Sequence, residues 1–187
     1  MSLKWCALSF ILLLIVCMVF TNISEGIEDN PTKEQVEEAI KYGRVSPEKI
    51  FNTDYVKPAT FGNWPSLGGG LVKSKLVRIA VVSAMKIRGK KKLTEEETQK
   101  LLESNELTIS YRGGTDVYKI KLRQGANVID PKTMVKPDLA GKDPAKHMAF
   151  ITASFPYSRL DLHARTTIMI EKDYGTTKFE VNFADIP

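Results

Sequence analysis

The stretch at positions 68–92, GGGLVKSKLVRIAVVSAMKIRGKKK, constrains the fold more than any other part of the chain. It is the longest continuous apolar block beyond the N-terminus, and its first half alternates between apolar and polar residues, as a half-buried strand does. Its second half places five apolar residues on one face of a helix: Val77, Ala80, Val81, Ala84 and Met85. We therefore expect a strand that runs directly into a short helix.

Residues 1–26 have the layout of a secretory signal peptide. One basic residue, Lys4, precedes an apolar run at positions 5–20, and small residues follow at Ser24 and Gly26. Cleavage after Gly26 would export the remaining chain to the periplasm or the extracellular space. The alternative is an uncleaved membrane anchor, although the apolar run is shorter than the ~20 residues that a helix needs to cross a bilayer.

Both cysteines, Cys6 and Cys17, lie in this segment. The exported chain would therefore have no disulfide and no cysteine nucleophile. A lipoprotein site at Cys17 is a weaker alternative, because the preceding Val16 is bulky. The formal charge of the whole chain is only +5. An excess of this size favours solubility, and it is too small to predict a nucleic-acid partner, so we expect none.

Residues 27–70 are predicted to form a helical and irregular arm. Thr32 and Gln35 have the spacing of a capping box before a narrow apolar helix, and Gly43 is the predicted end of that helix. Turn-forming and aromatic residues follow. Three of these aromatic residues are candidate ligand-binding residues that would line a groove: Tyr55, Phe61 and Trp64. We favour the alternative that they pack on the core, because large aromatic side chains carry much of the burial in a small domain.

Residues 71–187 are predicted to form an α+β domain with a C-terminal antiparallel sheet. Thr94 and Glu97 form a second capping box, and strand patterns then follow one another to the C-terminus. In the last strand Phe179, Val181 and Phe183 are predicted to point inward. The fold class is therefore α+β: short N-terminal helices followed by an antiparallel, sandwich-like β-sheet.

One predicted strand carries a row of basic residues. Lys119, Lys121 and Arg123 fall on one face, and the apolar residues fall on the other: Tyr118, Ile120 and Leu122. These three basic residues are candidate binding residues for an acidic polymer. We favour the alternative that they keep a solvent-facing surface charged and block edge pairing.

A second basic group surrounds Gly89 and contains five residues: Lys86, Arg88, Lys90, Lys91 and Lys92. Such a group can bind phosphates or an anionic membrane surface. We favour the simpler interpretation of a solvated helix end, where lysines are mildly stabilising near the last carbonyls.

The sequence contains no recognised set of catalytic residues. Asp161 and His163 are a feasible pair of metal ligands, but no third ligand has motif spacing, and Ser158 lacks the surroundings of a nucleophile elbow. Nothing singles out two members from the available carboxylates: Glu103, Glu106, Asp116, Asp130 and Asp161. We predict no catalytic residues, no metal and no cofactor.

The predicted function is an exported, non-catalytic binding or structural module of the cell envelope. Its partner would be another envelope protein or an anionic polymer, and a membrane only if residues 1–26 are retained. The alternative is an exported hydrolase that uses carboxylates or His163. Convergence of Asp161, His163 and another acid in one pocket would favour the enzyme.

Overall fold

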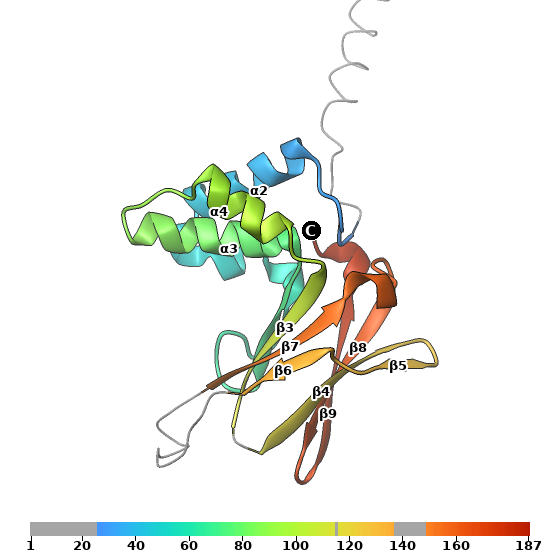
Figure 1. The fold of residues 1–187 in the computed structure, drawn as a ribbon. Coiled ribbons are helices and arrows are strands. Elements are labelled where there is room, and N and C mark those ends of the chain that lie inside the picture. The colour runs from blue at the N-terminus through green and yellow to red at the C-terminus, as the bar shows by residue number, and fades with distance from the viewer. Residues whose placement is uncertain (1–25, 115, 137–148) are drawn as a thin grey trace, which may run out of the picture.

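The computed structural model of the protein describes residues 26–114, 116–136 and 149–187. Two antiparallel sheets form a sandwich, and a layer of helices lies across one end of it (Figure 1). The predicted α+β fold with a sandwich-like sheet is confirmed. The predicted export segment lies outside the described residues apart from Gly26.

The strands divide into sheet A and sheet B. Sheet A has the order β1-β2-β3-β7-β6, with bounds Thr60–Gly62, Gly69–Lys73, Glu106–Gly113, Ala149–Pro156 and Thr133–Val135. Sheet B has the order β5-β4-β8-β9, with bounds Asn127–Ile129, Val117–Gln124, Arg165–Lys172 and Gly175–Asn182. The arm before residue 70 is therefore part of the sandwich, because its strand β1 pairs with β2.

The helical layer contains α2 (Lys33–Val45), α3 (Lys75–Arg88) and α4 (Glu95–Leu102). Short 3-10 helices lie at Pro47–Asn52, Lys57–Ala59, Tyr157–Arg159 and Phe183–Asp185. Both predicted capping boxes are present, one at Thr32 and one at Thr94. Gly43 was predicted to end its helix, and that prediction is wrong, because α2 continues to Val45. A β-carbon at Gly43 would collide with the carbonyl oxygen of Ala80, so this glycine serves the close approach of α2 and α3.

The predicted strand-to-helix element is confirmed as β2 followed by α3. Ser74 ends the strand and caps the helix, since its hydroxyl oxygen accepts a hydrogen bond from the Val77 amide at 3.1 Å. Lys75 is almost fully buried, with its ammonium 3.1 Å from Asp29 Oδ1 and 5.6 Å from the ring centroid of Tyr157. Burial also raises the pKa of the Tyr157 phenol to about 12. These contacts fix the start of the described chain against the start of α3.

The predicted buried face of α3 is wrong in part. Met85 is 57% exposed and Val81 is half-buried, whereas Leu76, Ile79 and Ser83 are buried. The Ser83 hydroxyl donates to the Ile40 carbonyl of α2 at 3.1 Å, so packing against α2 rotates the buried face away from Met85.

The sandwich core confirms the predicted inward face of the last strand, because Val181 is only 7% exposed and Phe183, which follows the strand, is fully buried. On β4 the prediction for Tyr118 is wrong: this side chain is 52% exposed, and Val117 is buried in its place. The register of β4 against β8 shifts between Val117 and Lys119, and this irregularity reverses the faces at the start of the strand.

Candidate functional site

The clearest surface feature is an aromatic group on the outer face of sheet A, which we call the Trp64 cluster: Phe51, Trp64, Arg112 and Phe150. The Trp64 ring meets Phe51 edge-on at a centroid distance of 5.3 Å and lies 5.8 Å from the Phe150 ring. The Arg112 guanidinium carbon is 5.8 Å from the centroid of Phe150. Half of Phe150 (52%) is exposed, so this cluster presents an aromatic surface to solvent.

Strand alternation brings the cluster to the outer face. Tyr111 packs in the sandwich between Phe61 and Phe179, so the next residue on β3, Arg112, points away from it. Arg112 also faces Phe150 directly in the β3–β7 register. The loop between β1 and β2 is tied to the same point, because Arg112 Nη1 donates to the Pro65 carbonyl at 2.6 Å.

Two hydroxyl residues lie on the same face of sheet A, next to the aromatic rings. Ser110 and Thr152 oppose each other on β3 and β7, with 3.4 Å between their hydroxyl oxygens. Among the described residues, Trp64 Nε1 and Arg112 Nε find no hydrogen-bond acceptor although both atoms are buried. The cluster therefore combines aromatic faces and a guanidinium group with the half-buried Thr152 hydroxyl beside them, whereas Ser110 is buried.

The other two predicted aromatic binding residues do not join Trp64 at this surface. Tyr55 is buried and stacks on Tyr42 at a centroid distance of 4.5 Å, and burial raises the pKa of its phenol. Phe61 is buried between the sheets, 5.0 Å from Phe179. Both occupy packing positions, so the predicted groove lined by all three residues is not present among the described residues.

The predicted basic row on β4 is matched by polar groups of its own sheet. Lys119 forms an ion pair with Asp130 at 2.7 Å, and Lys121 forms one with Glu171 at 2.7 Å. Arg123 Nη2 donates to the Thr167 hydroxyl at 3.3 Å. The hydrogen bond from Lys119 lowers the pKa of Asp130, and the hydrogen bond to Glu171 raises the pKa of Lys121. Each cation of the row therefore has a partner within the fold.

A hollow of about 760 Å³ lies between the β4–β5 hairpin and the segment 159–164. Gln124 builds its floor: the amide nitrogen donates to the Asp161 carbonyl at 2.8 Å, and the amide oxygen accepts from the Asp161 amide at 2.9 Å. Arg159 and Asp161 line the hollow, but neither His163 nor a second carboxylate is among its lining residues. The convergence that would favour a hydrolase is not found in this hollow.

The candidate catalytic groups have other contacts. The Asp161 carboxylate accepts from the His163 backbone amide at 3.0 Å, so it closes its own turn and does not orient the imidazole. Glu106 is paired with Lys132 at 2.7 Å. In the part of the chain that the structure describes, no three His, Cys, Asp or Glu residues come close enough to hold a metal ion.

The sequence interpretation named Trp64 and missed its partners. Arg112 and Phe150 lie on strands far apart in the chain, and neither has a local pattern that distinguishes it. An exposed aromatic residue opposite an arginine would have been a usable signal only if the pairing of β3 with β7 had been known.

Among residues 26–114, 116–136 and 149–187, no helix is long and apolar enough to cross a membrane. Comparisons with protein-family models, with curated proteins and with solved structures found no match.

Proposed function

We propose that the protein is an exported, non-catalytic binding module of the cell envelope and that the Trp64 cluster is its binding surface. One observation carries the proposal: Trp64, Arg112 and Phe150 come from three separate segments and converge on a sheet face where Phe150 remains half exposed. Tryptophan and arginine are the residue types that dominate binding energy in protein interfaces. Trp64 packs against the core from its edge and Phe150 is exposed beside it, an arrangement that suits recognition.

The chemistry of the cluster defines the kind of partner. The rings offer flat apolar faces, while the guanidinium of Arg112 and the hydroxyl of Thr152 offer hydrogen bonds beside them. A partner segment that places an apolar face on Phe150 and a carbonyl or carboxylate toward Arg112 would match this surface. We favour another envelope protein over a charged polymer, because Arg112 is the one cation in the cluster.

Export rests on the signal-peptide layout of residues 1–26. Mass spectrometry of the protein from its native host tests it: a chain that begins near Ile27 supports cleavage. An intact Met1 in the membrane fraction would instead support the anchor.

The binding surface is tested by site-specific photo-crosslinking in the native host. A photoreactive residue in place of Phe150 should give a discrete crosslinked product, and Trp64→Ala should abolish it. Tyr174 is the matched control, because it is 98% exposed but lies in the turn between β8 and β9, outside the cluster. The same product from both positions, or none from position 150, would contradict the proposal.

The hydrolase alternative has weaker support, because Asp161 and His163 do not converge with another acid among the described residues. Hydrolysis of envelope glycans or peptides by the purified protein, lost in both Asp161→Asn and His163→Ala, would restore it.

A further inference from the structure

We propose that the turn that ends α3 is a contact site for the headgroups of an anionic phospholipid bilayer. We call it the cationic turn and define it by four residues: Arg88, Lys90, Lys91 and Lys92. It lies in the helical layer, apart from the Trp64 cluster, and the proposal does not depend on that cluster. It also differs from a membrane anchor, because it is formed by residues of the helical layer and holds whether or not residues 1–26 are removed.

The backbone of the cationic turn already satisfies the end of the helix. The Gly89 amide donates to the Met85 carbonyl at 3.1 Å, the Lys90 amide to Ile87 at 2.9 Å, and the Lys91 amide to Lys86 at 2.8 Å. The last two hydrogen bonds are those of a Schellman motif. The lysine ammonium groups are therefore not needed to cap the helix.

Lys90 occupies the position of this motif that suits it least. Its φ is +55°, in the left-handed region where glycine is favoured, and Gly89 stands one residue too early to take that place. A lysine here is a local cost to stability. Residues that break a local rule are expected where they serve a function, and the function that distinguishes lysine from glycine is its charge.

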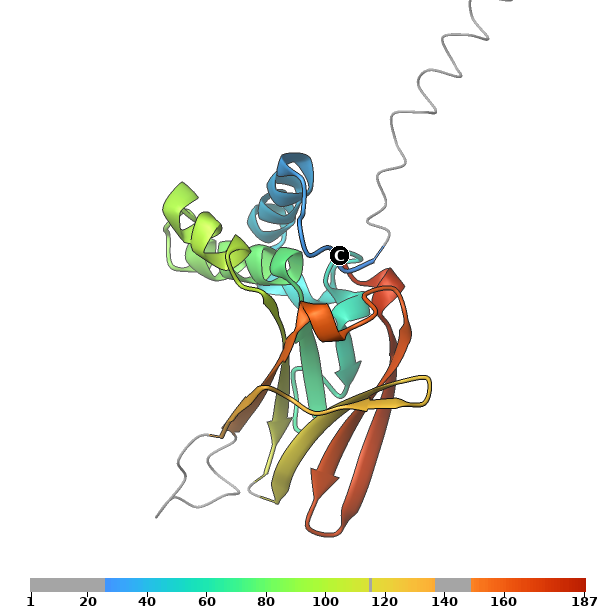
Figure 2. The ribbon, with the colours of Figure 1, turned by 45° about the vertical axis from the view of Figure 1, so that its right-hand side comes forward.

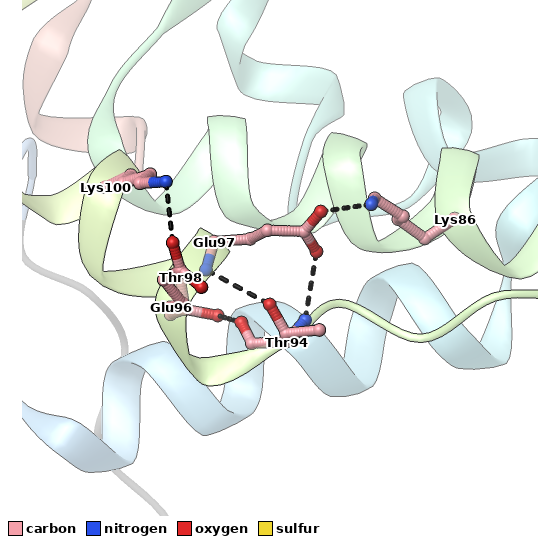
Figure 3. Close-up of polar contacts among 6 residues, drawn as sticks. All are labelled: Lys86, Thr94, Glu96, Glu97, Thr98 and Lys100. Atoms are coloured by element: carbon pink, nitrogen blue, oxygen red, sulfur yellow. Dashed lines mark hydrogen bonds and ion pairs between the residues drawn. The ribbon is translucent and has the colours of Figure 1, made fainter.

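All four cations of the turn are exposed, and none forms an ion pair with a carboxylate of the described residues. The nearest acidic residues, in the first turn of α4, have other contacts, as Figure 3 shows. Glu97 binds Lys86 and the Thr94 amide, and Glu96 binds Lys100 at 2.8 Å. Glu95, exposed beside them, forms no ion pair with another described residue, and this single carboxylate leaves an excess of positive charge at the tip.

The surroundings favour a bilayer over a polymer. The turn joins α3 to α4 at the tip of the helical layer farthest from the C-terminus (Figures 1 and 2), so it forms a projection that can touch a flat surface. Met85, one helical turn before Gly89, is 57% exposed and adds an apolar side chain beside the cations. Cations next to an exposed apolar side chain match the interface of an anionic membrane. No aromatic residue lies in the turn to stack on the bases of a single-stranded nucleic acid.

The test is co-sedimentation of the protein, purified from its native host, with vesicles at low salt. Vesicles of equal parts phosphatidylglycerol and phosphatidylcholine should bind it, vesicles of phosphatidylcholine alone should bind it much less, and salt should reverse the difference. Each lysine near an anionic surface contributes roughly fivefold to binding, so Lys90, Lys91 and Lys92 changed together to Gln should weaken it roughly a hundredfold.

Two matched variants locate the effect. The β4 row changed to glutamine, at Lys119, Lys121 and Arg123, removes the same charge and should leave vesicle binding unchanged. Trp64→Ala should also leave it unchanged, so failure of the Trp64 proposal and failure of this one give different results. Loss of binding in a β4 variant that is still folded, or equal binding to both kinds of vesicle, would overturn the proposal. Stronger retention by soluble heparin than by anionic vesicles would assign the turn to a polymer instead.

Lysine acetylation, read by mass spectrometry, gives an independent measurement that does not depend on the fate of residues 1–26. Anionic vesicles should protect Lys90, Lys91 and Lys92 from acetylation and leave Lys119 accessible. Equal acetylation of the turn with and without vesicles would contradict the proposal even if the protein sediments.

Discussion

The row of cations on β4 and the cationic turn after α3 look alike in the sequence and differ in the structure. On β4, Lys119 and Lys121 each hold a carboxylate at 2.7 Å, supplied by Asp130 and Glu171. The turn lies at a helix end where no neighbouring strand supplies an acid. A count of basic residues therefore does not identify an anion-binding surface, because the number of unpaired cations depends on what packs beside them.

The sheet register explains the difference. Lys119 lies directly opposite Glu171 in the β4–β8 pairing, and Lys121 lies opposite Met169. Glu171 nevertheless pairs with Lys121, its diagonal neighbour on the same face, which leaves Lys119 to reach Asp130 at the end of β5. At the end of α3 the neighbouring acids, in the first turn of α4, pair with Lys86 and Lys100, so the four cations of the turn face solvent.

The largest loss of stability should come from disrupting the buried core of sheet B, the sheet that carries the β4 ion pairs. Val181→Asp places a charge among buried apolar side chains of sheet B and should lower the free energy of unfolding by about 3 kcal/mol or more. Urea denaturation measures the change. A variant as stable as the parent would show that β9 does not cover this core.

Breaking one β4 pair should have a smaller effect. Lys121→Met leaves Glu171, whose side chain is only 14% exposed, without its cation and should lower the melting temperature. Lys91→Met in the cationic turn is the matched control and should leave the melting temperature unchanged. Equal changes in the two variants would remove the distinction between the two regions.

In the cationic turn we expect a substitution to raise the stability of the fold. Lys90→Gly relieves the left-handed conformation and should raise the free energy of unfolding by about 1 kcal/mol. The same variant should bind anionic vesicles more weakly, so that stability and binding change in opposite directions. A destabilised Lys90→Gly variant would show that the lysine contributes packing and would remove the argument from strain.

The smallest effect concerns pH at the base of the turn. The hydrogen bond from Lys86, together with that from the Thr94 amide, lowers the pKa of Glu97. A carboxylate with a lowered folded-state pKa stabilises the fold above its ordinary pKa, and this stability is lost as the pH falls through the folded-state value. Glu97→Gln should therefore melt below the parent at neutral pH, and the gap should close in acid. A gap that is constant with pH would exclude the ionised pair as its cause.

The Trp64 cluster could be predicted from the sequence only in part. Trp64 was identifiable as an aromatic residue in a turn-rich arm, but the exposed surface beside it depends on Arg112 and Phe150, which the pairing of β3 with β7 brings together. Tyr55 and Phe61 had the same local surroundings in the sequence, yet they are buried. Composition and spacing do not distinguish these buried rings from the half-buried ring of Trp64 in an irregular segment.

Local signals by themselves determined several elements of this fold. The capping boxes at Thr32 and Thr94, the strand that runs into α3 and the inward face of β9 all follow from residues within one or two turns of each other, because caps and side-chain periodicity depend on short-range geometry. The tertiary structure decided which charges are neutralised and which rings are exposed. Those outcomes depend on strand register and on helix packing, as with Gly43 against α3, and the partners involved are distant in the chain.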